Sequence, residues 1–367
     1  MKFGLFFLGS SPRGNYRREY EEILEQCQYA EELGFTFAWL AEHHGSSYGA
    51  MSRPPVLMSA IAERTQTLRI GTAVAILPFD YPVRTAEEYA MVDVLSGGRL
   101  DFGVGRGYQP REFAHQGSNQ STSREVFSES LDIIVGLWKG EPFSYEGQHF
   151  QVNNVEVFPK PLQQPVPVMI AAISPSTFEF AAQKGFDIMT APALMPLEDL
   201  KKHIISGART MIQNGRMPAQ VDIPVTMVVH LAPTVEQAFD DSRTAIEFQF
   251  SHALKATPGF EGKAPKGYEA YEEVLISGDS TVPPVEELNA SGNVLVSDPE
   301  GARNVIRALR DDVGVKRFCC LMNTGGLEHD RVLRSMRLFA EEVMPEFGDE
   351  TPVPEAFVAE QAEAEVV

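Results

Sequence analysis

The chain has few cysteines, a shortage of positive charge and no long apolar run. Its 367 residues include only three cysteines, Cys27, Cys319 and Cys320, whose spacing fits neither a disulfide framework nor a metal site. Lysine and arginine number 31 against 51 aspartate and glutamate residues, and the net charge of −20 repels nucleic acid and anionic membranes. We therefore expect neither as a partner, and any anionic ligand requires a local positive site.

No targeting or membrane-spanning segment is evident. The N-terminal apolar run, residues 3–8, is too short for the core of a signal peptide and is followed at once by polar residues. No other run approaches the roughly 20 residues that a membrane-spanning helix needs. These features favour a cytoplasmic location with reduced cysteines.

The chain does have a regular alternation of short apolar strands and amphipathic helices. Strands are predicted at 3–8, 36–41, 68–77, 100–105, 168–172, 187–191, 224–231 and 317–323. Eight strand–helix units without an internal repeat or a linker predict an α/β fold, a single (β/α)8 TIM barrel over residues 1–347.

Three segments depart from this alternation. Residues 143–160 alternate in the manner of an inserted β-hairpin. Residues 257–294 are rich in Gly, Pro, Lys and Glu and are predicted to form a lid or mobile loop. The acidic, Ala/Glu/Pro-rich residues 348–367 are predicted to be a disordered tail.

In a barrel of this kind the site lies at the carboxyl ends of the strands, and His43 and His44 follow the second strand. Imidazole titrates near neutral pH, so His43 can accept and donate a proton in one cycle. His44 is as well suited to a structural role as to catalysis. Adjacent residues of a strand point to opposite faces, so we predict that the pair binds no metal.

An anion site is predicted where Ser174 and Pro175 open a helix after the fifth strand. Its first N–H groups and positive dipole end attract a phosphate, and Arg106 could add a bidentate charge. Gly103, Gly105 and Gly107 do not complete a dinucleotide fingerprint, because Tyr108 stands where the third glycine is needed. These glycines could instead let the strand pass a crowded barrel corner.

Several short motifs carry a resemblance to a known family. They are Trp39-Leu40-Ala41-Glu42-His43-His44, Gly71-Thr72-Ala73, Leu95-Ser96-Gly97-Gly98-Arg99, Gly105-Arg106-Gly107, Cys319-Cys320 and Val343-Met344-Pro345. With them the chain resembles the bacterial luciferase-like family of flavin-dependent monooxygenases, and in particular the luciferase α subunit. The motifs cover almost the whole chain up to the tail.

The resemblance implies roles for individual residues. Arg106, Ser174, Ser176 and Thr177 would hold the flavin phosphate, and Thr72, Ala73 and Val74 would lie against the isoalloxazine ring. A non-proline cis peptide is expected between Ala73 and Val74. His43 matches the histidine that the family uses near the flavin.

The predicted activity follows from the absence of a nicotinamide fingerprint. A separate flavin reductase would supply reduced FMN (FMNH2), and O2 would add to it as a C4a-peroxyflavin that oxygenates a small apolar or aromatic/carbonyl substrate. Water must be excluded from the flavin site, because the peroxyflavin loses peroxide if water reaches it. The candidate walls of the site are Phe6, Leu8, Ile76, Phe79, Phe113 and Met195, with residues 257–294 as the lid.

Two other functions stay open. One is F420-dependent hydride transfer, with a longer and more anionic cofactor. The other is a non-catalytic flavin-binding subunit, against which His43, Arg106 and residues 174–177 argue. Gly105 stands where luciferase α subunits commonly carry cysteine, and Ile173 replaces an acidic residue, so light emission is not expected. The resemblance and the size of the barrel predict a homodimer.

Overall fold

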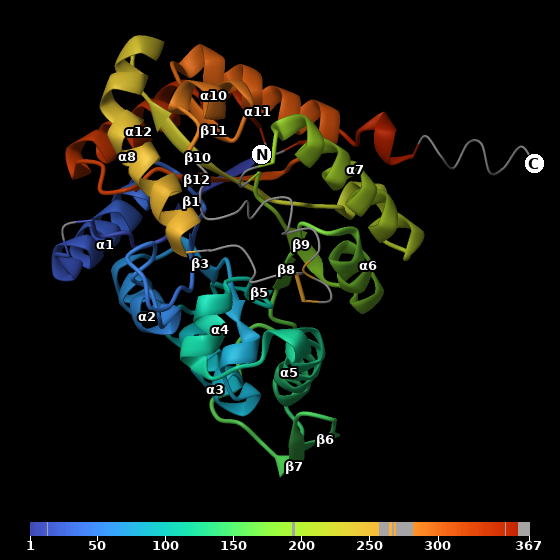
Figure 1. The fold of residues 1–367 in the computed structure, drawn as a ribbon. Helices are drawn as coiled ribbons and strands as arrows, with labels where there is room; N and C mark the ends of the chain where they lie inside the picture. Colours follow the sequence, from blue (N-terminus) through green and yellow to red (C-terminus); the bar gives the residue numbers. More distant parts are fainter. Residues whose placement is uncertain are drawn as a thin grey trace, which may run out of the picture.

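The computed structural model describes residues 1–12, 14–192, 195–256, 264–265, 268, 282–348 and 350–358. Eight parallel strands form a ring, and helices surround it (Figure 1). The ring consists of β1 (Lys2–Phe7), β2 (Phe37–Leu40), β3 (Arg69–Thr72), β5 (Leu100–Gly105), β8 (Val168–Ala171), β9 (Asp187–Met189), β10 (Val225–Leu231) and β12 (Arg317–Leu321). They pair in the order β10-β12-β1-β2-β3-β5-β8-β9, and a parallel bridge between Thr190 and Val225 joins the two ends. The predicted (β/α)8 barrel is therefore confirmed.

Helices cover the outside of the ring (Figure 1). They are α1 (Tyr16–Glu32), α2 (Pro54–Arg64), α3 (Pro82–Leu95), α4 (Pro110–Gln116), α5 (Ser123–Leu137), α6 (Pro175–Lys184), α7 (Leu197–Gln213), α8 (Val235–Ala256), α10 (Val285–Ala290), α11 (Pro299–Val313) and α12 (His329–Glu342). In α11 the residues at helical spacing, Ala302, Ile306 and Leu309, are buried, and the Asp298 side chain caps the helix by accepting the Gly301 N–H at 2.8 Å.

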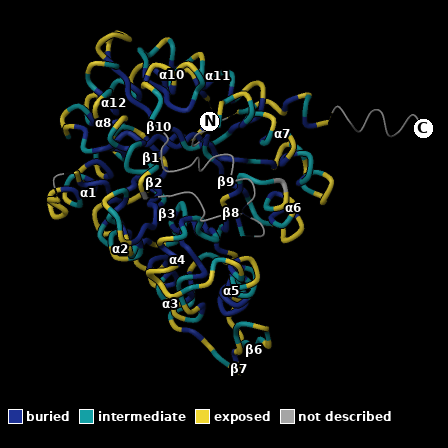
Figure 2. Tube along the Cα trace, in the orientation of Figure 1, coloured by how far each residue is buried: buried dark blue, intermediate teal, exposed yellow. Residues whose placement is uncertain are grey.

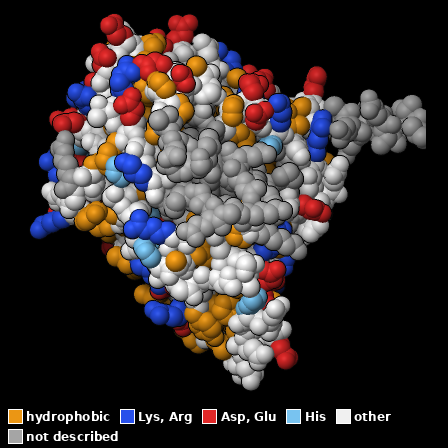
Figure 3. Space-filling view, viewed as in Figure 1, with side chains coloured by type: hydrophobic (Ala, Val, Ile, Leu, Met, Phe, Trp, Pro, Cys, Tyr) orange, Lys and Arg blue, Asp and Glu red, His pale blue; other side chains and the backbone are white. Residues whose placement is uncertain are grey.

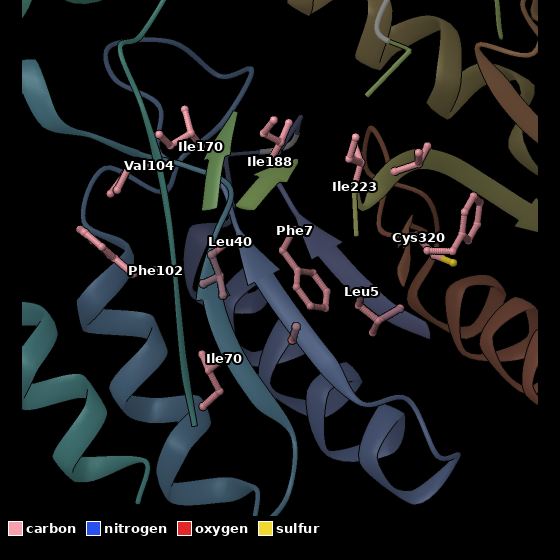
Figure 4. Packing of buried hydrophobic residues seen from close by; sticks show 14 of the residues in the cluster. Leu5, Phe7, Leu40, Ile70, Phe102, Val104, Ile170, Ile188, Ile223 and Cys320 are labelled. Carbon is pink, nitrogen blue, oxygen red and sulfur yellow. The ribbon is translucent and has the colours of Figure 1, made fainter. Parts of the chain in front are cut away.

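The residues of the central strands are buried, as the dark blue centre of Figure 2 shows, and their side chains pack in separate clusters on the two faces of the ring. Leu5, Phe7, Leu40 and other outward residues pack under the helices in one large core (Figure 4). Phe37, Trp39, Met169, Met189 and Cys319 form a separate cluster inside the barrel. Cys319 belongs to the inner cluster and Cys320 to the outer core, as the alternation of a strand requires.

Two predictions about irregular segments need correction. Residues 285–290 of the predicted loop form α10, and Val294 begins β11 (Val294–Ser297), which pairs with β10. Most of the remaining lid segment, at 257–263, 266–267 and 269–281, lies outside the described residues. In the predicted disordered tail, residues 350–358 pack on the barrel instead: Phe357 is buried and Arg209 Nε donates to the Ala356 carbonyl at 2.9 Å.

Within the predicted hairpin insertion, β6 (Phe143–Glu146) and β7 (Gln151–Val155) pair in antiparallel fashion. The strand predicted at 68–77 is interrupted: β3 ends at Thr72, and β4 (Ala75–Ile76) then pairs with β5. Within the part of the chain that the structure describes, no helix combines the length and apolar character needed to cross a membrane.

Candidate functional site

The interruption between β3 and β4 lies at the predicted flavin-facing position. The peptide bond between Ala73 and Val74 is cis, as expected from the resemblance. Thr72 is fully buried, and its Oγ1 donates to the Gly103 carbonyl at 2.7 Å. Ala73 and Val74 are partly buried beside the cluster inside the barrel, so this segment is held against β5.

That close contact requires both glycines of β5, Gly103 and Gly105. A Cβ atom at Gly103 would lie 1.9 Å from the Thr72 carbonyl oxygen, and one at Gly105 would lie 2.4 Å from Val74 Cγ2. The crowded-corner interpretation of these glycines is therefore correct. The same contact means that a cysteine side chain at position 105 would have to displace Val74.

A pocket of about 350 Å³ opens between β8, α5 and the start of α6. Its polar lining consists of Arg106, Arg124, Ser176 and Thr177, and its apolar lining of Phe127, Ile170, Ala171 and Phe180. Arg124 Nη2 donates to Ser176 Oγ at 3.0 Å. Arg106 lies with its guanidinium carbon 4.7 Å from the centre of the Tyr268 ring. The pocket therefore combines two positive side chains with two hydroxyl groups.

Ser174 occupies the N-cap position of α6, but its hydroxyl does not cap the helix. Its Oγ lies 3.0 Å from Thr177 Oγ1 and 3.3 Å from Ser176 Oγ, so the three hydroxyls form one cluster. The structure thus brings together the four residues predicted for the phosphate. It adds Arg124, which the sequence analysis missed. Arg124 lies in the first turn of α5, where its positive charge is unfavourable beside the positive end of the helix dipole. This unfavourable position was the only feature of the sequence that could have indicated a functional role for Arg124.

His43 is paired with a buried carboxylate. Its Nδ1 lies 3.0 Å from Glu112 Oε1, and the same oxygen accepts the backbone N–H of His44 at 2.8 Å. Glu112 belongs to the first turn of α4 and is fully buried. A carboxylate at this distance favours the tautomer that carries its proton on Nδ1, which leaves Nε2 as the basic ring nitrogen.

His44 has different surroundings. Its Nε2 lies 2.9 Å from Glu42 Oε1, while Glu42 Oε2 accepts the Ile76 N–H at 3.0 Å. Burial raises the pKa of Glu42, and the hydrogen bond to His44 opposes that rise. The His44 ring meets Phe79 edge-on at 5.6 Å. Glu42 therefore links the segment after β2 to β4, His44 pairs with Glu42, and a catalytic role for His44 stays a prediction.

Beyond Glu42 lies a second pocket, of about 250 Å³, with a charged lining. Arg53 forms ion pairs there with Asp80 and with Glu88, the latter at 3.0 Å. These pairs join α2 to α3 and to the turn before it. We regard this pocket as structural, because its arginine is already held by two carboxylates from the neighbouring elements.

Five of the six predicted wall residues fall into two groups. Ile76, Phe79 and Phe113 converge on Gly107, where an added Cβ would lie 2.9 to 3.4 Å from all three side chains. Phe6 and Leu8 belong to a small cluster with Ala41 and Leu321. Met195 lies apart from both groups, since its side chain packs against the outer core and its carbonyl accepts a hydrogen bond from Asn293.

Acidic side chains are spread over the helices of the face shown in Figure 3, in keeping with the net charge. The Arg106–Arg124 pocket is thus a local positive site in an acidic chain. Such a site suits a compact anionic group, and the His43–Glu112 pair suits proton transfer.

Comparison with known proteins gives a consistent picture. A family model described as luciferase-like monooxygenase matches residues 1–317. The chain is 28% identical to the alkanal monooxygenase alpha chain of a Kryptophanaron alfredi symbiont over 357 residues, 94% of this chain and 98% of that protein. It is also 28% identical to limonene 1,2-monooxygenase of Rhodococcus erythropolis, over 90% of this chain and 82% of that protein.

Solved structures show the same relationship. Monooxygenase RslO1 from Streptomyces bottropensis has a TM-score of 0.83 at 28% identity, covering 95% of this chain and 100% of that one. The oxygenating constituent of 3,6-diketocamphane monooxygenase from Pseudomonas putida, in complex with FMN, has a TM-score of 0.74 at 19% identity, covering 96% of this chain and 99% of that one. The second likeness shows the fold alone. Because the family model spans 317 of the 367 residues and includes both the His43–Glu112 pair and the Arg106–Arg124 pocket, the chain belongs to the luciferase-like monooxygenase family.

Proposed function

We propose that this protein is the oxygenase of a two-component system, which uses FMNH2 and O2, through a C4a-peroxyflavin, to oxygenate a small apolar or aromatic/carbonyl substrate. The observation that carries the proposal is the pocket in which Arg106 and Arg124 face the hydroxyls of Ser176 and Thr177. A phosphate monoester has a second pKa near 6 and so carries almost two negative charges at neutral pH. Two guanidinium groups match that charge.

The residues beside the pocket fit the remainder of a flavin. Thr72, Ala73 and Val74 would support the isoalloxazine ring, because β5 holds this segment in place from behind. A bound reduced flavin would supply the electrons that O2 needs. The chain itself would bind and orient the flavin, exclude water with its apolar walls and exchange a proton at His43 Nε2.

This geometry also bears on the alternatives. F420 has a longer and more anionic tail, whereas the pocket lining supplies two arginines, enough for the charge of one phosphate monoester. A non-catalytic subunit would have no need of a buried carboxylate on His43. We therefore retain FMN as the proposed cofactor, with F420 as the alternative to be tested.

A separate reductase is proposed as a partner. A relative from Acinetobacter baylyi, 32% identical over 55% of this chain and 57% of that protein, is named the oxygenase component of a flavin-dependent trigonelline monooxygenase. A homodimer is proposed because α2 and α3 expose Val56, Met91 and Leu95, with 73%, 51% and 46% of each residue exposed. We propose a cytoplasmic location, where a reductase can deliver FMNH2.

Anaerobic titration with FMNH2 and, separately, with reduced F420 tests the cofactor. Air is then admitted and absorption spectra are followed by stopped flow. We expect FMNH2 to bind and a long-lived C4a-peroxyflavin band to follow. Binding of F420 alone, without an oxygen adduct, would reject the monooxygenase mechanism in favour of hydride transfer.

A further inference from the structure

One buried side chain outside the barrel strands, Tyr268, contacts both of the segments that supply the arginines of the Arg106–Arg124 pocket. We propose that Tyr268 is a positioning residue, which holds Arg106 opposite Arg124 for a phosphate group and so favours a phosphorylated cofactor over the same compound without its phosphate. The inference rests on the proposed function, because it takes this pocket as the site of the FMN phosphate.

The hydroxyl group of Tyr268 is bound at two positions. Its Oη lies 3.0 Å from the Gly107 carbonyl oxygen and 2.8 Å from Ser123 Oγ. A carbonyl group only accepts, so the phenol donates to Gly107 and Ser123 donates to the phenol. Gly107 directly follows Arg106, and Ser123 directly precedes Arg124. A single side chain therefore joins the two segments that carry the arginines.

The ring of Tyr268 contacts the Arg106 side chain itself. The guanidinium carbon lies 4.7 Å from the ring centre. This distance is within the range of a cation–π contact, which extends to roughly 6 Å. Burial raises the pKa of Tyr268, so the phenol stays neutral at neutral pH. A neutral ring attracts the guanidinium without adding a negative charge that would repel a phosphate.

Two physical effects make this contact important for anion binding. Guanidinium groups that line one pocket repel each other, and no anion offsets that repulsion before the ligand arrives. An arginine side chain also loses rotamer freedom on binding a ligand, unless the protein has already ordered it. Tyr268 counters both effects, because it holds Arg106 in place in advance.

The bond to Ser123 supplies the fixed side of this arrangement. Ser123 begins the regular helix α5, whereas Arg106 and Gly107 follow the end of β5. The Tyr268 backbone N–H also donates to the Pro265 carbonyl at 3.0 Å, so the residue is held through its main chain as well. Loss of the Tyr268 side chain should therefore release Arg106 and leave Arg124 on its helix.

The test measures anion binding by the full chain in the absence of O2. Dissociation constants of FMNH2 and reduced riboflavin are determined by anaerobic titration, and that of inorganic phosphate by equilibrium dialysis, for the wild type and Tyr268→Leu. Tyr81→Leu is the matched control, because Tyr81 is 47% exposed. We expect Tyr268→Leu to weaken binding of FMNH2 and of phosphate by about 3- to 10-fold and to leave reduced riboflavin unchanged.

Double variants show whether Tyr268 acts through Arg106. In the Arg106→Ala background, Tyr268→Leu should weaken FMNH2 binding no further, because the side chain that the ring holds is gone. In the Arg124→Ala background, Tyr268→Leu should keep its effect, because Arg106 is still there to be held. A general loss of structure would weaken binding in both backgrounds.

Two further substitutions separate the ring from the hydroxyl group. Tyr268→Phe keeps the ring and loses only the hydroxyl bonds, so it should weaken FMNH2 binding less than Tyr268→Leu. A trifluorinated phenylalanine in place of Tyr268 has nearly the shape of phenylalanine but a less negative ring face, and it should bind FMNH2 more weakly than Tyr268→Phe. Should Tyr268→Leu fail to fold, this comparison decides in its place.

The proposal is overturned if Tyr268→Leu weakens reduced riboflavin as much as FMNH2, if its effect persists without Arg106, or if fluorination changes nothing. Phosphate is measured without flavin, so the positioning role and the proposed function can fail separately. Phosphate binding that depends on Tyr268, without FMNH2 binding, would overturn the proposed function and keep the positioning role. A C4a-peroxyflavin with no effect of Tyr268→Leu would do the reverse.

Discussion

The two arginines of the proposed phosphate pocket are expected to contribute unequally to FMNH2 binding. Arg106 is half-buried beneath the Tyr268 ring, whereas Arg124 is exposed and hydrogen-bonded to Ser176 at 3.0 Å. A charge-assisted hydrogen bond shielded from solvent contributes about 1.5 to 3 kcal/mol, so Arg106→Ala should weaken FMNH2 binding by about 10- to 150-fold. Solvent screens Arg124, and about 1 kcal/mol, or roughly 5-fold, is expected for Arg124→Ala.

Anaerobic titration with reduced FMN and reduced riboflavin separates the phosphate from the ring system. Both variants should bind reduced riboflavin as the wild type does, because riboflavin carries no phosphate. Arg111→Ala is the matched control, since Arg111 is exposed on α4 outside the pocket lining. Equal losses for FMN and riboflavin, or an effect of Arg124→Ala larger than that of Arg106→Ala, would refute the reasoning.

Three other perturbations have defined outcomes. His43→Ala should lower product formation by about 10²- to 10⁴-fold while FMNH2 still binds in the anaerobic titration; full activity would exclude His43 as acid or base. Gly105→Ala should lower thermal stability by about 1 to 3 kcal/mol through contact with Val74, whereas Gly348→Ala, whose Cβ meets no atom within 4 Å, should not. Burial raises the pKa of Glu19 from 4.5 to about 7, so the folded chain holds more protons than the unfolded chain between these values. Stability against urea should therefore fall by roughly 3 kcal/mol as the pH rises through this window, and Glu19→Gln should abolish that fall; an unchanged pH profile would contradict it.

The sequence was sufficient for features that repeat or that leave a local mark. Eight apolar runs separated by amphipathic helices predicted the barrel, and its eight strands lie where those runs are. The helix begun at Asp298 followed from its capping residue and its apolar spacing. The cis bond at Ala73–Val74 came from the family resemblance, because no local propensity marks a non-proline cis peptide.

Long-range partners were not readable. Glu112 lies 69 residues from His43, and Arg124 lies 52 residues from Ser176. Periodicity predicts that a helix exists, but it does not tell which strand end its first turn will face. Glutamate is almost never fully buried unless paired, so nothing in the sequence marked Glu112 as a core residue.

Short elements were missed for a different reason. Helix α10 has six residues, less than two turns, and β11 has four, so neither produces a measurable period. The tail packs through a single buried aromatic residue, Phe357, in an otherwise acidic segment. A composition-based argument averages over such a residue and predicts disorder.

The segment from β5 to α4 connects the two halves of the proposed site. Its glycines press β5 against residues 72–74, Arg106 lines the phosphate pocket, and Glu112 holds His43. Arg106 and Glu112 are only six residues apart, so this strand–turn–helix fixes the separation between the proposed phosphate site and the proposed acid–base residue, His43. Tyr108 lies between them in the chain and contacts the same histidine. A change in this segment that shifts β5 should therefore disturb flavin binding and proton transfer together, whereas a change in α6 or α5 should affect binding of the phosphate alone.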